Sequence, residues 1–157
     1  MELRRAAKDD YDVLFELFSE GQNLHVQALP HFFRPPAKDK LFYSYFDKII
    51  DSEDKHLIIG LDNEKPFGYI LFIIGDIQQS IYQTGGQFIY INQLVVKESY
   101  RGRGFGKTLV GHVKQVAKQK KIRKIGLDVW LFNEPAIKFF ERQGFSAFNQ
   151  IMWYENG

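Results

Sequence analysis

The sequence contains no cysteine and no long hydrophobic run. Without cysteine the chain forms no disulfide, no thiolate metal site and no cysteine nucleophile. The longest aliphatic and aromatic run is YILFII at residues 69–74, which is too short to span a membrane. The first ten residues also lack the apolar stretch of a signal peptide. These absences favour a soluble, cytoplasmic protein.

An excess of charge of one sign is also missing. The 21 basic and 19 acidic side chains leave a net charge of +2, which does not indicate a nucleic-acid partner. The one basic segment, KQKKIRK at 118–124, is interpreted as the solvated end of a helix. His31 and His56 have no partners at metal-ligand spacing. We therefore expect no nucleic acid, no membrane and no metal among the ligands.

Core-forming residues are abundant: 45% of the 157 residues are hydrophobic and 16% aromatic, which suits one domain with a buried core. Helical spacing dominates the first third, and strands joined by turns follow from residue 55. The pattern predicts helices over 11–18, 22–29, 41–50, 106–117 and 133–143, and strands over 2–6, 56–62, 67–77, 88–96 and 124–130. The tail, 145–155, is expected to add one or two strands.

A glycine-rich stretch, YRGRGFGKT at residues 100–108, lies between a predicted strand and a predicted helix. Closely spaced glycines let backbone N–H groups turn inward, and the helix that begins at Gly106 adds the positive end of its dipole. Arg101, Arg103 and Lys107 add positive charge, which suits a pyrophosphate. The alternative interpretation is a turn that only begins a helix.

Two well-known phosphate motifs do not fit this stretch. Gly106, Lys107 and Thr108 imitate the end of the P-loop, G-x-x-x-x-G-K-S/T, but Arg101 stands where that motif needs its first glycine. The glycine spacing also misses the dinucleotide pattern G-x-G-x-x-G. A P-loop nucleotide hydrolase therefore has little support.

Residues 94–110, LVVKESYRGRGFGKTLV, resemble the acyl-CoA signature of the GNAT superfamily of N-acetyltransferases, Q/R-x-x-G-x-G/A, with Arg101, Gly104 and Gly106 at its fixed positions. About thirty residues later, NEPAIKFFERQGF at 133–145 resembles the second signature, N-x-x-A-x-x-F-Y-x-x-x-G-F. The resemblance implies an α+β fold, an α/β sandwich with a mixed central sheet of six to seven strands and about four flanking helices. It also implies a single GNAT-like domain over residues 1–157.

By this resemblance acetyl-CoA is the co-substrate. Its pyrophosphate would lie on the glycine loop, and its pantetheine arm would lie where the strand ending at Val96 splays from the strand at 124–130. The residues that the resemblance assigns to the coenzyme are Leu94, Val95, Val96, Arg101, Gly102, Arg103, Gly104, Phe105, Gly106, Lys107, Asn133 and Phe140.

Two catalytic groups that are usual in the family have no counterpart. Asn92 and Gln93 stand where acidic residues are frequent, and Phe140 stands where a tyrosine usually protonates the leaving sulfur. Tyr154 is a candidate acid, and the catalytic residues are otherwise unassigned. Further candidates are Tyr90 and Tyr100 as acids, and Glu16, Glu20 and Asp47 as bases. Asp128 is read as a solvated sheet residue, with acid–base work as the alternative.

The resemblance implies transfer of the acetyl group to a primary amine of a small molecule or peptide, by direct attack in a ternary complex. The alternative is a regulatory module that binds acyl-CoA with weak or no catalysis, which the three substitutions at positions 92, 93 and 140 motivate. His25, in NLHVQALPHFF, resembles a position in a substrate-side loop, although a capping or core histidine is the competing interpretation. Relatives are often dimers, so a homodimer is a further expectation.

Overall fold

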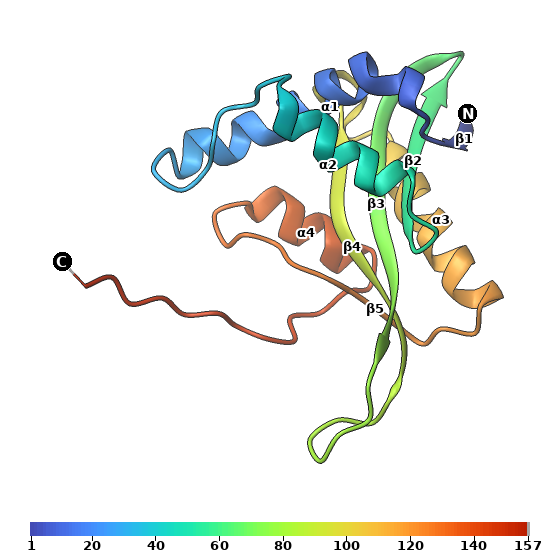
Figure 1. The fold of residues 1–157 in the computed structure, drawn as a ribbon, viewed down its shortest axis with the longest axis vertical. Helices are drawn as coiled ribbons and strands as arrows, with labels where there is room; N and C mark the ends of the chain where they lie inside the picture. The colour runs from blue at the N-terminus through green and yellow to red at the C-terminus, as the bar shows by residue number, and fades with distance from the viewer. Residues whose placement is uncertain (157) are drawn as a thin grey trace.

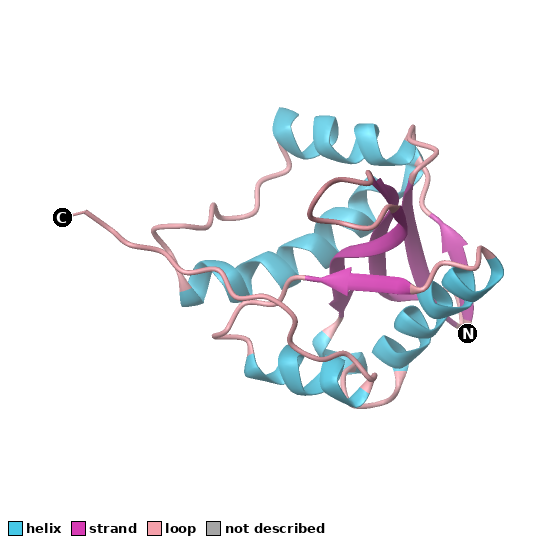
Figure 2. Ribbon diagram, turned by 90° about the horizontal axis from the view of Figure 1, so that it is seen from below, coloured by secondary structure: helices cyan, strands magenta, loops and turns pink. Residues whose placement is uncertain are grey.

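The computed structural model, which describes residues 1–156, contains a mixed five-stranded sheet with helices on both faces (Figures 1 and 2). The strands are β1 (Glu2–Arg5), β2 (Lys55–Asp62), β3 (Lys65–Ile77), β4 (Gly86–Val96) and β5 (Lys124–Leu127). The helices are α1 (Tyr11–Ala28), α2 (Lys40–Ile50), α3 (Phe105–Gln119) and α4 (Glu134–Arg142), with short 3-10 turns η1 (Lys8–Asp10) and η2 (Glu98–Tyr100).

The strands lie in the order β1-β2-β3-β4-β5. The first four pair antiparallel, whereas β4 and β5 pair parallel and are connected through α3. Asn63 and Glu64 adopt positive φ angles of 48° and 65° in the turn between β2 and β3, as a tight two-residue hairpin requires. The parallel pair therefore surrounds the helix that follows the glycine loop, as the sequence predicts.

Each face of the sheet carries its own apolar core. On one face, Ile70, Ile89 and Ile91 pack with the buried side of α3 and with Phe140 of α4. On the other face, Tyr69 and Leu71 pack with α1 and α2. The helices are amphipathic, so each covers the sheet with its apolar stripe and exposes the opposite side. We refer to these two sides of the sheet as the α1/α2 face and the α3/α4 face.

The α+β class, the mixed sheet and the four flanking helices are confirmed, but the sheet has five strands and not six to seven. The missing strands are those expected in the tail, which forms no strand in this structure because no ladder partner lies beside it. The helices expected over 11–18 and 22–29 are one continuous helix, α1. Gly21 lies within α1 and does not interrupt it. A Cβ there would approach Val95 Cγ2 to 3.0 Å, so glycine at this position permits α1 to pack closely on β4.

Asp10 ties β1 to the beginning of α1. Its carboxylate accepts two hydrogen bonds from the Arg4 guanidinium, at 2.8 and 2.7 Å, and one from the Ala7 amide at 2.8 Å. The hydrogen bonds from Arg4 lower the pKa of Asp10, against an opposing effect of burial. Asp9 and Asp10 precede the apolar stripe of α1 in the sequence, and an aspartate at either position could cap the helix. Asp10 does occupy the N-cap position, but its side chain binds Ala7 and no amide of α1.

Because the folded pKa of Asp10 lies below its unfolded value, the stability it contributes is complete above about pH 4 and is lost as the pH falls through the folded pKa. We expect Asp10→Asn to lower the free energy of unfolding at pH 7 by about 1–3 kcal/mol and to flatten its dependence on pH between about 4 and 2. Urea denaturation across that range is the measurement. Asp9→Asn is the control, and an unchanged pH profile in Asp10→Asn would contradict this account.

Candidate active site

The glycine loop between β4 and α3 owes its shape to two left-handed residues. Gly102 has a φ of 73° and Gly104 a φ of 87°. A Cβ built on either glycine meets no atom within 4 Å, so a side chain would have space there. Glycine is favoured at both positions because of the left-handed backbone conformation. The loop surface at these two positions is therefore open to a ligand.

Free amides lie at the point where this loop enters α3. The first hydrogen bond of the helix runs from the Thr108 amide to the Gly104 carbonyl at 3.1 Å. The preceding amides, those of Phe105, Gly106 and Lys107, donate to no acceptor within residues 1–156. Unsatisfied N–H groups at the positive end of a helix dipole form an anion site.

The two sequence signatures contact each other here. A Cβ at Gly106 would lie 3.2 Å from two ring carbons of Phe139, so the small residue lets α4 pack on the first turn of α3. The side chain of Asn133 caps α4 by accepting from the Ala136 amide at 3.3 Å, and Gly144, at a φ of 87°, ends it. Asparagine at the N-cap and glycine just beyond the last turn are common signals for the two ends of a helix. The assignment of Asn133 to the coenzyme remains a prediction.

Phe140 stands in the core and supplies no hydroxyl. Its side chain is buried against Phe139 and Phe145, at ring-centroid distances of 5.1 and 5.6 Å. Its assignment to the coenzyme remains a prediction.

A fork opens in the sheet next to the glycine loop. Strands β4 and β5 pair only from Phe88 opposite Lys124 to Ile91 opposite Leu127. Beyond Ile91, β4 continues to Val96 with β3 as its sole partner, and the register slips at Asn92, which forms a bulge. The chain after β5 departs towards α4. The divergence that the sequence predicted between these strands is present.

The fork leaves backbone groups of β4 without a ladder partner. The Lys97 amide donates to Phe67 on β3, and successive residues of a strand direct their backbone groups to alternate edges. Val96 and Leu94 therefore direct theirs towards the fork. The Val96 carbonyl accepts from Arg101 Nε at 2.9 Å, so the Val96 amide and both Leu94 groups are left open there among the described residues.

The two arginines of the loop are held in place and are not the mobile cations that the sequence suggested. Arg101 Nη2 pairs with Glu20 Oε1 of α1 at 3.1 Å. The guanidinium of Arg103 lies over the rings of Tyr100 and Phe105, 5.5 and 5.3 Å from their centroids. Lys107 is exposed on the first turn of α3. Among the described residues, Lys107 is therefore the basic side chain of the loop that no such contact holds in place.

The α1/α2 face of the fork carries a chain of hydroxyl and amide groups. The buried Tyr69 hydroxyl donates to Gln93 Oε1 at 2.6 Å, and Gln93 Nε2 donates to the Tyr45 hydroxyl at 3.1 Å. Burial raises the pKa of Tyr69 above its ordinary value, so this hydroxyl stays protonated at neutral pH. Gln93, where the family often has an acid, therefore serves here as a hydrogen-bonded link between strand and helix.

A tyrosine and a carboxylate meet at the base of the fork. Ile89 and Ile91 face α3, as do Ile125 and Leu127. Tyr90, which lies between the two isoleucines, and Asp128, which directly follows Leu127, therefore face the α1/α2 side.

The ring of Tyr90 lies over Gly126, where a Cβ would approach its Cδ2 to 3.5 Å. Burial, and secondarily the neighbouring Asp128 carboxylate, raise the pKa of Tyr90. In the sequence, only the two-residue alternation of each strand indicates that Tyr90 and Asp128 share a face of the sheet. The sequence alone did not bring these two residues together.

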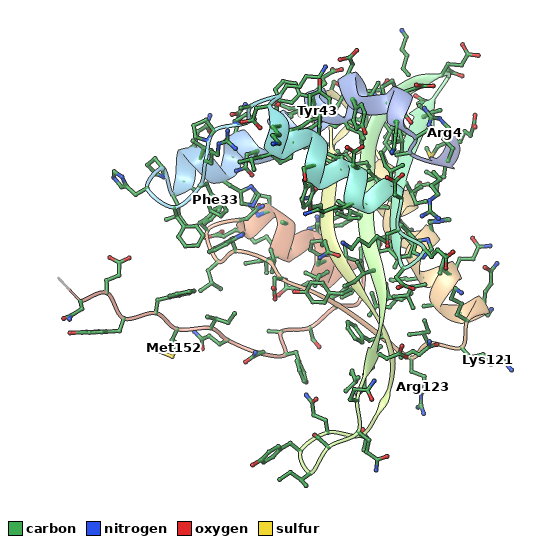
Figure 3. The ribbon with its side chains drawn as sticks, viewed as in Figure 1. Arg4, Phe33, Tyr43, Lys121, Arg123 and Met152 are labelled. Carbon is green, nitrogen blue, oxygen red and sulfur yellow. The ribbon has the colours of Figure 1, made fainter. Side chains whose placement is uncertain are left out.

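Aromatic rings line the outer side of the fork. His25 of α1 contacts Phe33 and Phe132, at centroid distances of 5.0 and 5.7 Å, and its Nδ1 lies 2.9 Å from the Gly21 carbonyl oxygen. Trp130 packs edge-on against Phe33, with their ring centroids 5.0 Å apart. Phe33 is labelled in Figure 3, on the loop that follows α1. The loop after α1 and the loop after β5 are thus joined by rings in edge-to-face contact, and His25 is part of that junction.

The other acid–base candidates lie apart from this site or are already paired. Tyr154 is on the exposed tail. Glu16 pairs with Lys97 at 2.7 Å, and Glu20 holds Arg101. Asp47 accepts from the Tyr11 hydroxyl and raises the pKa of Tyr11 to about 12. Within residues 1–156 no cluster of three or more potential metal ligands occurs, and no helix has the length and hydropathy of a membrane span.

The family model described as the acetyltransferase (GNAT) family matches residues 21–145 of the chain. N-alpha-acetyltransferase 30 of Schizosaccharomyces pombe is 27% identical over 119 residues, covering 75% of this chain and 74% of that protein. A tetramutant of the BH1408 protein from Bacillus halodurans has a TM-score of 0.92 at 25% identity, with 99% and 100% of the two chains covered. An aminoglycoside N-acetyltransferase solved with CoA shares the fold, at a TM-score of 0.73 and 17% identity over 99% and 93% of the chains.

Proposed function

Since the chain belongs to the GNAT family of acetyltransferases, we propose that it transfers the acetyl group of acetyl-CoA to a primary amine by direct attack in a ternary complex. The observation that carries this proposal is the fork between β4 and β5, which leads to three free amides at the N-terminus of α3. If the diphosphate of acetyl-CoA binds these amides, the thioester arm of the coenzyme would lie along the unpaired edge of β4 at Leu94. The relative solved with CoA shares this fold and supports the same choice of co-substrate.

The reaction forms one bond and breaks one. The amine nitrogen adds to the thioester carbonyl carbon, the C–S bond breaks, and the thiolate leaves. Acetyl-CoA supplies the activated carbonyl, and the Leu94 amide would donate to its oxygen as negative charge develops there. The thiolate takes its proton from water, because Phe140 has none to give. A missing acid of this kind costs roughly 10²–10⁴-fold in rate without abolishing turnover.

The amine must lose a proton, and the α1/α2 side of the fork offers a carboxylate for it. We assign Asp128, which lies beside Tyr90, to hold the acceptor ammonium and receive that proton. Asp128 is exposed, so an incoming amine can reach it, and it stands one residue beyond the last pair of β4 and β5. Aromatic rings at the same opening suit the apolar part of an acceptor or its cation.

Asp128→Asn is expected to lower kcat/KM for the amine by about 10²-fold or more, because the amide cannot take a proton. The dissociation constant for CoA should stay within about twofold, since the variant leaves the glycine loop intact. Isothermal titration and steady-state kinetics separate the two quantities. Asp76→Asn, on β3 away from the fork, is the matched control. Equal kcat/KM in Asp128→Asn and the unaltered protein would remove Asp128 from the mechanism.

Release of the CoA thiol is the test of the proposed function. Acetyl-CoA is incubated with polyamines, aminoglycosides, amino acids and peptides that carry a free amino terminus, and thiol release is followed with a chromogenic disulfide. The N-alpha-acetyltransferase and aminoglycoside relatives make peptide and small-molecule amines the first candidates. Thiol release above the uncatalysed rate with one of these classes supports an enzyme. CoA binding without any release favours the regulatory module, for which the buried Phe140 is the observation in favour.

A further inference from the structure

The basic segment at the end of α3 has no part in the proposed acetyl transfer. Lys118 and Lys120 stand at the end of the helix, and Lys121, Arg123 and Lys124 follow on the way into β5. All five side chains are exposed, and within residues 1–156 none of them pairs with a carboxylate. Positive charge that is concentrated in this way and left without acidic partners attracts anions.

A buried isoleucine fixes the loop that carries the last three of these cations. Ile122 is 7% exposed and packs in the α3/α4 core, and its amide donates to the Ala117 carbonyl at 2.8 Å. Lys121 has a positive φ of 59°, which ends α3 and turns the chain towards β5. Lys121 and Arg123, both labelled in Figure 3, therefore flank an anchored residue and project from a backbone of defined shape.

A cavity of about 330 Å³ lies between this loop and the β3–β4 hairpin. Ile77 and residues 84–87 of the hairpin line one side, and residues 121–124 line the other. Three of these lining residues are basic, and none of those that the structure places around the cavity is acidic or aromatic. The cations at 118 and 120 do not line it. The cavity thus divides the basic segment into a part that surrounds a space and a part that faces water.

The hairpin side of the cavity offers backbone donors. The amides of Thr84 and Gly85 donate to no acceptor within residues 1–156. Gly86 has a φ of 149°, which residues with a Cβ rarely adopt, and a Cβ there would meet no atom within 4 Å. Free amides, a threonine hydroxyl and nearby lysine and arginine side chains are the groups that bind phosphate oxygens in proteins.

The cavity is distant from the glycine loop. It lies at the beginning of β4, at Gly86, whereas the glycine loop follows the end of β4 at Val96. The strand between these two points spans roughly 30–35 Å. In CoA a single ribose separates the 3′-phosphate from the diphosphate, so a coenzyme bound on the glycine loop does not reach this cavity.

We propose that this cavity is a second phosphate site, which binds an oligophosphate chain, either free or as the phosphates of a nucleotide. Three surrounding cations suit an anion with several negative charges. The absence of a lining aromatic ring leaves nothing to stack on a nucleobase, so the phosphate chain itself is the part recognised. The volume is at the lower end of the range of small-ligand sites, roughly 300–1,000 Å³. The site does not depend on the proposed acetyl transfer.

Titration calorimetry with inorganic triphosphate in magnesium-free buffer tests this site, with CoA present in excess to occupy the glycine loop. The unaltered chain should bind one triphosphate. Arg123→Gln is expected to raise the dissociation constant about tenfold or more, because a charge-assisted hydrogen bond is lost. Lys118→Gln is the matched control: it removes one charge from the same segment outside the cavity, and should change the constant by less than about twofold.

A parallel titration with ATP distinguishes the two sources of the phosphate chain. Equal dissociation constants for triphosphate and ATP would assign the site to the free chain, and tighter binding of ATP would assign it to a nucleotide. Either result supports an oligophosphate site. Binding of neither anion would overturn the proposal, as would equal weakening by Arg123→Gln and Lys118→Gln.

Nuclear magnetic resonance locates the bound anion independently of CoA. In a ¹⁵N–¹H titration with triphosphate alone, the largest chemical-shift changes are expected at the amides of residues 84–87 and 121–124. Changes confined to residues 105–107 would place the anion on the glycine loop and overturn the proposal. Because this readout needs no coenzyme, a failure of this site and a failure of the proposed acetyl transfer are distinguishable.

Discussion

Replacing Gly104 by glutamate is expected to raise the dissociation constant for CoA at least 100-fold, about 2.7 kcal/mol, in a protein that remains folded. Gly104 is the N-cap of α3, and the amides that follow it are those proposed to bind the diphosphate. A Cβ on Gly104 meets no atom within 4 Å, so the new side chain begins in open space at the proposed phosphate position. There its carboxylate would repel the ligand and compete for the same N–H donors.

Gly144→Glu is the matched control for this variant. Gly144 also has a φ of 87°, and a Cβ there also meets nothing within 4 Å, but the residue lies beyond the far end of α4. The two variants share the backbone strain of about 1–2 kcal/mol and the added charge. Titration calorimetry should show weak binding only for Gly104→Glu. Similar affinities in the two variants would show that the diphosphate is not bound at the beginning of α3.

Replacing Gly68 by alanine is expected to lower the free energy of unfolding by about 3 kcal/mol, and so the melting temperature by roughly 6–12 °C. A Cβ on Gly68 would lie 2.2 Å from the Val95 carbonyl oxygen and 3.1 Å from Val96 Cα. Both are backbone atoms of β4, which no side-chain rotation moves aside. The strands β3 and β4 must then separate at the point where β4 borders the fork. We therefore expect the affinity for CoA to fall together with the free energy of unfolding.

Gly111→Ala makes the same chemical change with the opposite expected sign. Gly111 lies within α3, and a Cβ there meets nothing within 4 Å. Alanine should stabilise the helix by roughly 0.5–1 kcal/mol through its higher propensity and smaller loss of backbone entropy. Thermal and urea unfolding of the two variants side by side gives the comparison. Destabilisation of equal size in both would show that close backbone approach at Gly68 is not the cause.

The parts of the site that follow local rules could be predicted from the sequence. The strand, the glycine loop and helix α3 were expected in that order, because glycine spacing and an apolar stripe are local signals. The Asn133 cap and the Gly144 stop were equally readable. The contact between Gly106 and Phe139 explains why the two signatures have small and aromatic residues at these places, although only the structure shows it.

The parts that depend on contacts distant in sequence could not be predicted. The Arg101 side chain turns to Glu20 on α1, eighty-one residues earlier, and nothing near Arg101 signals this partner. Tyr90 and Asp128 meet only because the register sets Tyr90 opposite Gly126. The one or two strands expected over residues 145–155 do not form in this structure. Strand propensity depends on the packing and pairing that a segment finds, which its own sequence does not specify.

The location of the donor is tested most directly by its effect on individual backbone amides. In a ¹⁵N–¹H NMR titration of the chain with acetyl-CoA, the largest chemical-shift changes are predicted at Phe105, Gly106 and Lys107, with a second group at Leu94 on the fork. Changes should be small along the β2–β3 turn at Asn63 and Glu64. Binding that leaves the amides of residues 105–107 unshifted and perturbs another surface would contradict the proposed site.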